Sequence, residues 1–249
     1  MSLVIRRPEP RLDEPGAAAG QAVVRRGNFD VLIAFFVGFL LISNVAAVKL
    51  IEFGPSVEVL GFPVLPVIAD GGAFLFPVTY ILGDVLAEVF GLRGARRAIA
   101  VGFAVSIVAS VMFLLVGAAP PAAEWPNQDA FVAVLGFVPR IVAASLVAYV
   151  VGQLLNAWVL VRIKARTGEH SLWARLIGSS AVGCAADTVI FCTIAFAGVV
   201  GGGTLANYII VGYVYKMLVE IIMLPVTYRV VAWVKKHEPT YRRLSGQEP

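Results

Sequence analysis

Residues 205–234 read LANYIIVGYVYKMLVEIIMLPVTYRVVAWV, and this stretch decides the class of fold. It is longer than the ~20 apolar residues that a helix needs to cross a bilayer, and its charged residues are Lys216, Glu220 and Arg229. Pro225 predicts a kink late in the helix, and the extra length predicts a tilt. A charge near the bilayer centre costs roughly 2.5–3.5 kcal/mol even on a lenient insertion scale. Lys216 and Glu220 therefore each need a partner, a cavity or a function.

Further apolar stretches of similar length predict an all-α membrane protein with six transmembrane helices and one domain. The chain of 249 residues is 59% hydrophobic and only 14% charged, whereas a soluble domain carries about 25% charged residues. The transmembrane domain is expected over residues 29–236, between a disordered cytoplasmic tail (1–28) and a second cytoplasmic tail (237–249). The six expected spans are Phe29–Val48, Gly72–Phe90, Ala98–Gly117, Pro139–Val161, Leu176–Val199 and Leu205–Val234.

Basic residues gather on one side of the predicted bundle. Both tails and the connections at Arg93–Arg97 and Arg162–Arg175 are basic, whereas the opposite side carries Lys49 and little else. By the positive-inside rule, both termini are cytoplasmic. The net charge of +4 comes from clusters that suit membrane orientation and anionic headgroups, so we expect no nucleic-acid partner.

The first external connection, Glu52–Gly71, is too apolar for an ordinary loop. Its stretch Val57–Ala69 is too short to cross a bilayer and contains Pro63 and Pro66. The sequence therefore predicts a re-entrant or interfacial hairpin that caps a cavity.

Acids outnumber bases inside the predicted spans. Asp84 and Glu88 are four residues apart and share one helix face, while Asp187 is the deepest and most isolated acid. If both bases pair internally, carboxylates remain for a proton, a cation or the N–H donors of a solute, which indicates a binding or translocation site. The residues counted are Asp84, Glu88, Asp187 and Glu220 against Arg140 and Lys216.

Two further polar sets each allow two readings. Lys216 and Glu220 are four residues apart, so they form either an internal ion pair or two substrate contacts. Tyr149, Gln153 and Asn156 form a polar strip on the fourth helix, which either joins helices or contacts a substrate.

Residues 77–97, PVTYILGDVLAEVFGLRGARR, resemble the signature of the queuosine-precursor transporters, a vitamin-uptake-like membrane family. The matching signature elements are Asp84, Glu88, Phe90, Gly91, Ala95, Arg96 and Arg97. Elsewhere the resemblance rests on Ser43-Asn44, Arg140, Ala144-Ser145, Ala148-Tyr149, Gly152-Gln153, Asp187-Thr188, Phe191, Ala195-Phe196, Tyr213, Lys216 and Pro225. The resemblance covers all but the tails and the third helix. It departs at Asn156, where many members carry an acid after Gly-Gln.

The resemblance implies a six-helix importer of the bacterial inner membrane. Its substrate would be a 7-deazaguanine base, such as 7-cyano- or 7-aminomethyl-7-deazaguanine, that supplies tRNA modification. A guanine-type base presents N1–H and 2-amino donors beside an O6 acceptor, so a carboxylate, an amide or lysine, and aromatic rings together suit it. An adenine-like base lacks the paired donors and would leave the carboxylate unpaired.

The expected roles divide the polar residues into two groups. The substrate-binding group is Asp84, Asp187, Gln153, Asn156, Lys216, Tyr149, Phe191, Tyr213 and Asn44. In the second group, Arg140 and Glu220 hold the scaffold, and Glu88 forms an inner gate with Arg96 and Arg97.

Two other functions stay open. The chain could be the substrate-binding subunit of an ATP-driven uptake system, although it has no Gly-rich phosphate loop of its own. A membrane-embedded phosphotransferase is less favoured, because the third span carries no acid to help hold two metals. His170 and His237 are not spaced as metal ligands. We therefore expect no enzyme activity, catalytic residue, cofactor or metal, while a homodimer stays open.

Overall fold

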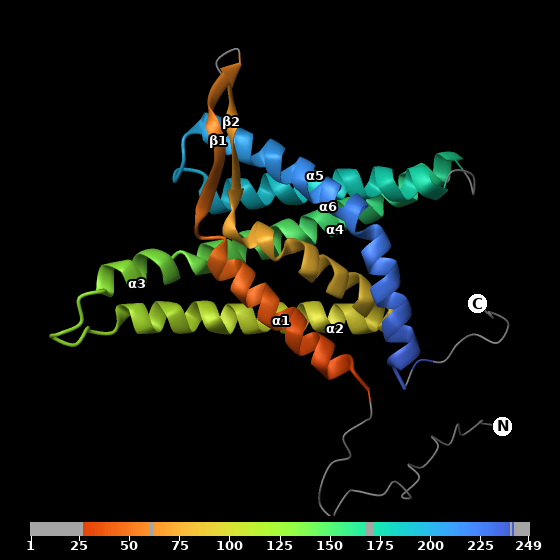
Figure 1. The fold of residues 1–249 in the computed structure, drawn as a ribbon, viewed down its shortest axis with the longest axis horizontal. Helices are drawn as coiled ribbons and strands as arrows, with labels where there is room; N and C mark the ends of the chain where they lie inside the picture. Colours follow the sequence, from red (N-terminus) through yellow and green to blue (C-terminus); the bar gives the residue numbers. More distant parts are fainter. Residues whose placement is uncertain (1–26, 60–61, 168–171, 240, 242–249) are drawn as a thin grey trace, which may run out of the picture.

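The computed structural model describes residues 27–59, 62–167, 172–239 and 241 of the chain. Long helices dominate it, with one β-hairpin after the first helix (Figure 1). Most of the predicted tail 1–28 and most of the predicted tail 237–249 lie outside the described residues. The elements are α1 (Phe29–Ala46), β1 (Leu50–Val59), β2 (Phe62–Asp70), a 3-10 turn η1 (Gly71–Phe74), α2 (Phe76–Ala118), α3 (Gln128–Leu135), α4 (Val138–Thr167), α5 (Leu172–Phe196) and α6 (Gly202–His237).

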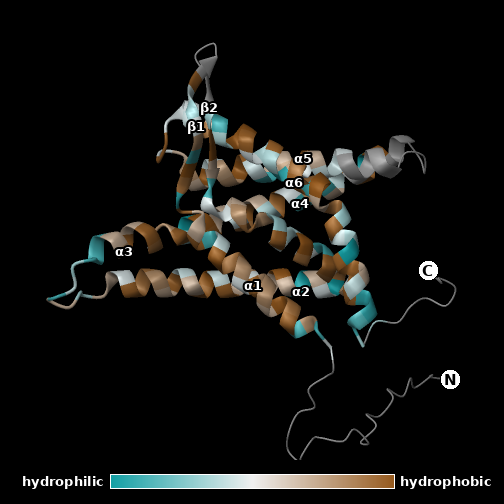
Figure 2. Ribbon diagram, in the orientation of Figure 1, coloured by the Kyte–Doolittle hydropathy of each residue, from teal (hydrophilic) through white to brown (hydrophobic). Residues whose placement is uncertain are grey.

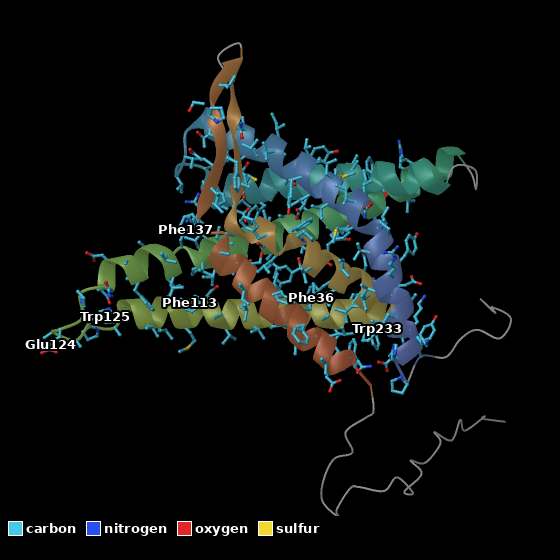
Figure 3. The ribbon with its side chains drawn as sticks, viewed as in Figure 1. Phe36, Phe113, Glu124, Trp125, Phe137 and Trp233 are labelled. Carbon is cyan, nitrogen blue, oxygen red and sulfur yellow. The ribbon has the colours of Figure 1, made fainter. Side chains whose placement is uncertain are left out.

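The described helices have the surface of a protein that spans a membrane several times. Five helical segments are long and apolar enough to cross a bilayer. Hydrophobic residues cover most of their length (Figure 2), and large apolar side chains such as Leu115, Ile221 and Ile222 are more than half exposed. Trp125 and Trp233 are also exposed and lie at opposite ends of the structure (Figure 3). Aromatic residues at two ends are typical of the two membrane interfaces.

Helix α2 changes direction at Gly91. This residue has φ 71° and ψ 179°, outside the helical region, and a positive φ favours glycine because glycine has no Cβ. Figure 1 shows the chain turning back here, so that the two parts of α2 run in opposite directions. The predicted connection between the second and third spans is thus a one-residue turn. Arg93, Arg96 and Arg97 lie on the helix that follows it.

The external connection is a β-hairpin. Strands β1 and β2 pair antiparallel, with Leu50 opposite Asp70 and Val59 opposite Phe62. Pairing satisfies backbone groups that an apolar segment could not leave exposed to lipid. The base of the hairpin contacts α6, where Ile68 is buried. The helical class is confirmed, and this hairpin is the exception within the described ranges.

Glycines bring α4 and α5 into close contact. A Cβ on Gly152 would lie 3.0 Å from the Gly183 carbonyl oxygen, and one on Gly183 would lie 2.8 Å from the Asn156 Cβ. Small residues allow such close approach of membrane helices. This contact sets the positions of Asn156 on α4 and Asp187 on α5.

Candidate functional site

A polar cavity lies between α2, α4, α5 and α6. Its volume is about 300 Å³, near the lower end of the roughly 300–1,000 Å³ typical of small-molecule sites. Aromatic rings line it from α2 and α4, and the charged groups come from α5 and α6. The lining residues are Phe76, Tyr80, Tyr149, Gly152, Gln153, Asn156, Ser180, Gly183, Cys184, Asp187, Lys216 and Glu220.

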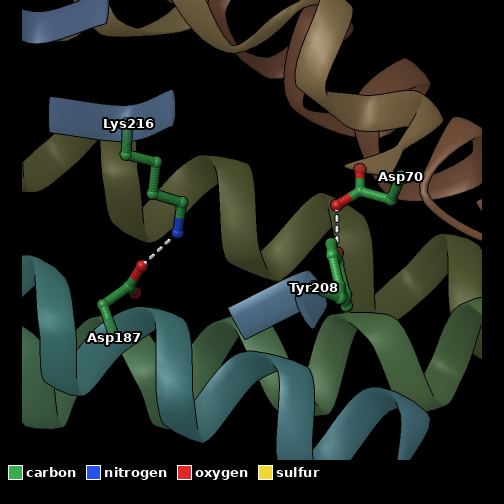
Figure 4. Close-up of polar contacts among 4 residues, drawn as sticks. All are labelled: Asp70, Asp187, Tyr208 and Lys216. Atoms are coloured by element: carbon green, nitrogen blue, oxygen red, sulfur yellow. Dashed lines mark hydrogen bonds and ion pairs between the residues drawn. The ribbon is translucent and has the colours of Figure 1, made fainter. Parts of the chain in front are cut away.

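An ion pair joins α5 to α6 in the wall of this cavity (Figure 4). The Lys216 Nζ lies 2.6 Å from the Asp187 Oδ2, and the two side chains are 22% and 31% exposed. The same ammonium lies 5.7 Å from the centre of the Phe76 ring, a distance typical of a cation–π contact. Of the two readings for Lys216, the pair with Glu220 one turn away is therefore wrong. Lys216 pairs with an acid on the neighbouring helix.

The cavity acid Glu220 on α6 has a second acid near it, Asp84 on α2, which does not line the cavity. Asp84 is close enough to Glu220 for their charges to interact, and the Tyr80 hydroxyl faces the Glu220 carboxylate. Among the described residues, neither Asp84 nor Glu220 forms an ion pair with a base. Of the two acids, Glu220 lines the cavity that contains the Asp187–Lys216 pair, whereas Asp84, an expected substrate contact, does not line it.

Asn156 contributes an acceptor without a partner. Its Oδ1 is buried and makes no hydrogen bond within the described structure. A buried acceptor left unpaired costs about 1–3 kcal/mol. Since Asn156 lines the cavity, an N–H donor of a bound molecule could satisfy this oxygen.

A second polar cluster closes the hairpin end of the bundle, and the sequence analysis missed it. The Tyr208 hydroxyl donates a hydrogen bond to the Asp70 carboxylate (Figure 4), and the Tyr215 hydroxyl donates to the Ala73 carbonyl oxygen at 2.8 Å. Burial raises the pKa of Asp70 above its ordinary value. The signal available in the sequence was an acid between an apolar run and Gly71-Gly72.

Several expected substrate contacts lie elsewhere. The Asn44 Nδ2 donates to the Ser106 Oγ at 3.4 Å and so joins α1 to α2. Phe191 packs at the edge of the core, with its ring 6.3 Å from that of Phe196. Tyr213 is half-buried on α6 and does not line the cavity.

Arg140 holds the end of α5. Its guanidinium donates to the carbonyl oxygens of Ile194, at 2.7 Å, and Ala197, at 2.6 Å. A basic group suits the free carbonyls at a helix C-terminus. This placement agrees with the structural role expected for Arg140, whereas Glu220, expected in the same role, lines the cavity.

The three residues expected to form an inner gate do not pair with one another within the described structure. Glu88 pairs with Lys235 near the end of α6, at 2.6 Å, and Arg97 lies over the Phe29 ring at 5.9 Å. Arg96 is exposed. Because Lys235 follows the last predicted span, the sequence pattern gave no reason to pair it with Glu88.

Comparison with known proteins finds one family. A family model described as "Putative vitamin uptake transporter" matches residues 70–230. The "Probable queuosine precursor transporter" of Bacillus subtilis is 29% identical over 81% of this chain and 89% of its own length. The "Queuosine precursor transporter" of Escherichia coli is 32% identical over 56% of this chain and 58% of its own length. The "Probable queuosine precursor transporter" of Haemophilus influenzae is 31% identical over 64% of this chain and 67% of its own length. No solved structure matches the chain.

Proposed function

The chain belongs to the vitamin uptake transporter family, and from this membership we propose that it imports a queuosine precursor through the α2–α4–α5–α6 cavity. The chain is a multi-pass protein of the bacterial inner membrane, as its family and its apolar helices indicate. The relatives in three bacteria are named as transporters and not as enzymes.

The two parts of α2 count as separate spans in this proposal. With α1, α4, α5 and α6 they give six crossings and place both termini on one side. Two contacts support this arrangement. The Asn28 backbone N–H donates to the Glu238 carboxylate at 2.8 Å, and Glu88 near the α2 turn pairs with Lys235. The turn and the C-terminal end of α6 are both basic, so the positive-inside rule makes this side cytoplasmic.

The cavity offers the groups that a 7-deazaguanine base requires. The Glu220 carboxylate, which forms no ion pair with a described base, can accept the adjacent N1–H and 2-amino donors, and Lys216 or Gln153 can donate to O6. The rings of Phe76, Tyr80 and Tyr149 supply apolar walls for the planar base.

One observation carries the proposal: Glu220 and the Asp187–Lys216 pair line a cavity that also contains the buried, unpartnered Asn156 Oδ1. Such acceptors favour a solute with several N–H donors over an adenine-like base, because any acceptor left unpaired weakens binding. Phe191, Tyr213 and Asn44 lie away from the cavity and have no direct contact role in this proposal.

Uptake by proteoliposomes that contain only this protein tests the function. We expect the vesicles to accumulate labelled 7-cyano- or 7-aminomethyl-7-deazaguanine and not adenine. Uptake that needs an added ATPase subunit would contradict a stand-alone importer and favour the ATP-driven alternative. Absence of uptake for every deazapurine, with or without that subunit, would reject the proposal.

A variant pair locates the pathway. Glu220→Gln should reduce uptake by about tenfold or more, since it removes a charged acceptor from the cavity. Asp129→Asn changes an exposed acid on α3 and should leave uptake unchanged. Equal effects of the two substitutions would show that the cavity is not the pathway.

A further inference from the structure

A groove separate from the transport cavity lies between α1 and the second part of α2. Its volume is about 380 Å³. Phe29 packs against Gly94 at one end of the helix pair, and Leu40 packs against Gly102 further along. The two helices therefore run in the same direction. The groove is lined by Phe29, Asp30, Ile33, Ala34, Val37, Arg97 and Val101.

One acid and one base stand together at one end of this apolar groove. Asp30 is in the first turn of α1, and Arg97 lies over the neighbouring Phe29 ring at 5.9 Å. Within the described residues, Asp30 and Arg97 form no ion pair with each other or with a third residue. Both side chains are exposed, so each can bind an outside group.

An apolar stripe continues from Arg97 along α2. Val101, Val105 and Val108 follow at helical spacing and are 37%, 36% and 62% exposed. The rise from Arg97 to Val108 is about 16 Å, close to the ~15 Å depth of one leaflet of the hydrocarbon core. A lipid whose charged head group lies at Arg97 could therefore extend its acyl chain along this stripe toward the centre of the bilayer.

We propose that this groove binds a phospholipid with a phosphoethanolamine head group. The Arg97 guanidinium binds the phosphate, and the Asp30 carboxylate accepts hydrogen bonds from the primary ammonium. The acyl chain lies along Ile33, Val37 and Val101. A phosphoglycerol head lacks the cation that Asp30 pairs with, and a choline head has no N–H to donate, so the charge pattern selects the ethanolamine head.

Titration of the purified full-length protein with short-chain lipids tests this site. Dihexanoyl phosphatidylethanolamine, phosphatidylcholine and phosphatidylglycerol are compared by the shift in the midpoint of thermal unfolding. We expect the ethanolamine lipid to bind about tenfold more tightly than the other two, and Arg97→Gln to weaken its binding by a similar factor. Arg93→Gln, which changes an exposed arginine outside the groove, should have no effect.

A second variant, Asp30→Asn, tests the same site if Arg97→Gln does not fold, because its preference among the three lipids can be measured separately. Asp30→Asn should remove the preference for ethanolamine over choline while phosphate binding persists. Equal binding of the three lipids to the unaltered protein would overturn the proposal. An unchanged preference in Asp30→Asn, or equal losses in Arg93→Gln and Arg97→Gln, would overturn it as well.

Discussion

Replacing Asp187 with Asn should both destabilise the protein and abolish uptake. At the observed 2.6 Å, two unit charges attract by about 6 kcal/mol at an effective dielectric constant of about 20, which is an upper bound on the pair. Removing one partner of a buried pair costs roughly 3–5 kcal/mol. Because Asp187 and Lys216 keep 31% and 22% of their side-chain exposure, water screens the uncompensated Lys216 charge. We therefore expect a loss of about 2–3 kcal/mol in the free energy of unfolding.

A double-variant cycle separates the two effects. The variants are Asp187→Asn, Lys216→Gln and their combination, each measured for unfolding free energy in a bilayer and for uptake in proteoliposomes. The double variant should regain about 1–3 kcal/mol of stability, because no charge is left unpaired. It should not regain uptake, because the site has lost both charged contacts.

The pair between Glu88 and Lys235 is the matched control. It has the same 2.6 Å distance, but its glutamate is 61% exposed, so Glu88→Gln should change stability by about 0–1 kcal/mol. Full uptake by the double variant at Asp187 and Lys216 would show that the pair is only structural and does not contact the substrate. Equal stability losses at the buried and the exposed pair would refute the burial argument.

Four other substitutions, one of them a control, test the surroundings of the site. Asn156→Leu should weaken binding of the deazapurine about tenfold or more by equilibrium titration, because its free oxygen is lost; unchanged affinity would exclude that contact. Gly183→Ala, which places a Cβ 2.8 Å from the Asn156 Cβ, should lower stability by about 1–3 kcal/mol and reduce uptake. Gly83→Ala, whose Cβ meets no atom within 4 Å, is its control and should unfold at an equal or higher midpoint, because alanine favours a helix over glycine. Since burial raises the pKa of Asp70, the folded protein keeps this proton to higher pH than the unfolded chain does. The stability from Asp70 is thus fully present below about pH 4 and is lost as pH rises through the raised pKa; Asp70→Asn should flatten that part of the pH profile of the unfolding midpoint.

The sequence predicted the spans more reliably than the connections between them. Apolar runs such as 205–234 gave helices within a few residues of the observed bounds, because membrane insertion depends on local hydropathy. The connection Glu52–Gly71 was predicted to form a hairpin, because its stretch Val57–Ala69 is too short to cross a bilayer, but paired strands were not predicted. The structure shows that antiparallel pairing of β1 and β2 satisfies the backbone of this apolar segment.

The kinds of side chain at the site were also predictable from the sequence, whereas the contacts between these side chains were not. Asp187, Lys216, Gln153 and Asn156 were expected at the site and line one cavity. Asp70 was missed, because no periodic pattern links the end of a strand to Tyr208 on a helix more than a hundred residues later.

Amino-acid order alone established that this protein crosses the membrane and carries more acids than bases inside it, since both properties depend on which residues lie in each apolar run. Tertiary structure alone decided that Lys216 pairs with Asp187, and that Glu220 lies near Asp84 without an ion pair to a described base. From the sequence, Lys216 could pair with Glu220 four residues away on the same helix or with Asp187 on the preceding helix. The choice depends on how closely helices approach and how they are rotated, which is fixed by contacts such as Gly152 against Gly183.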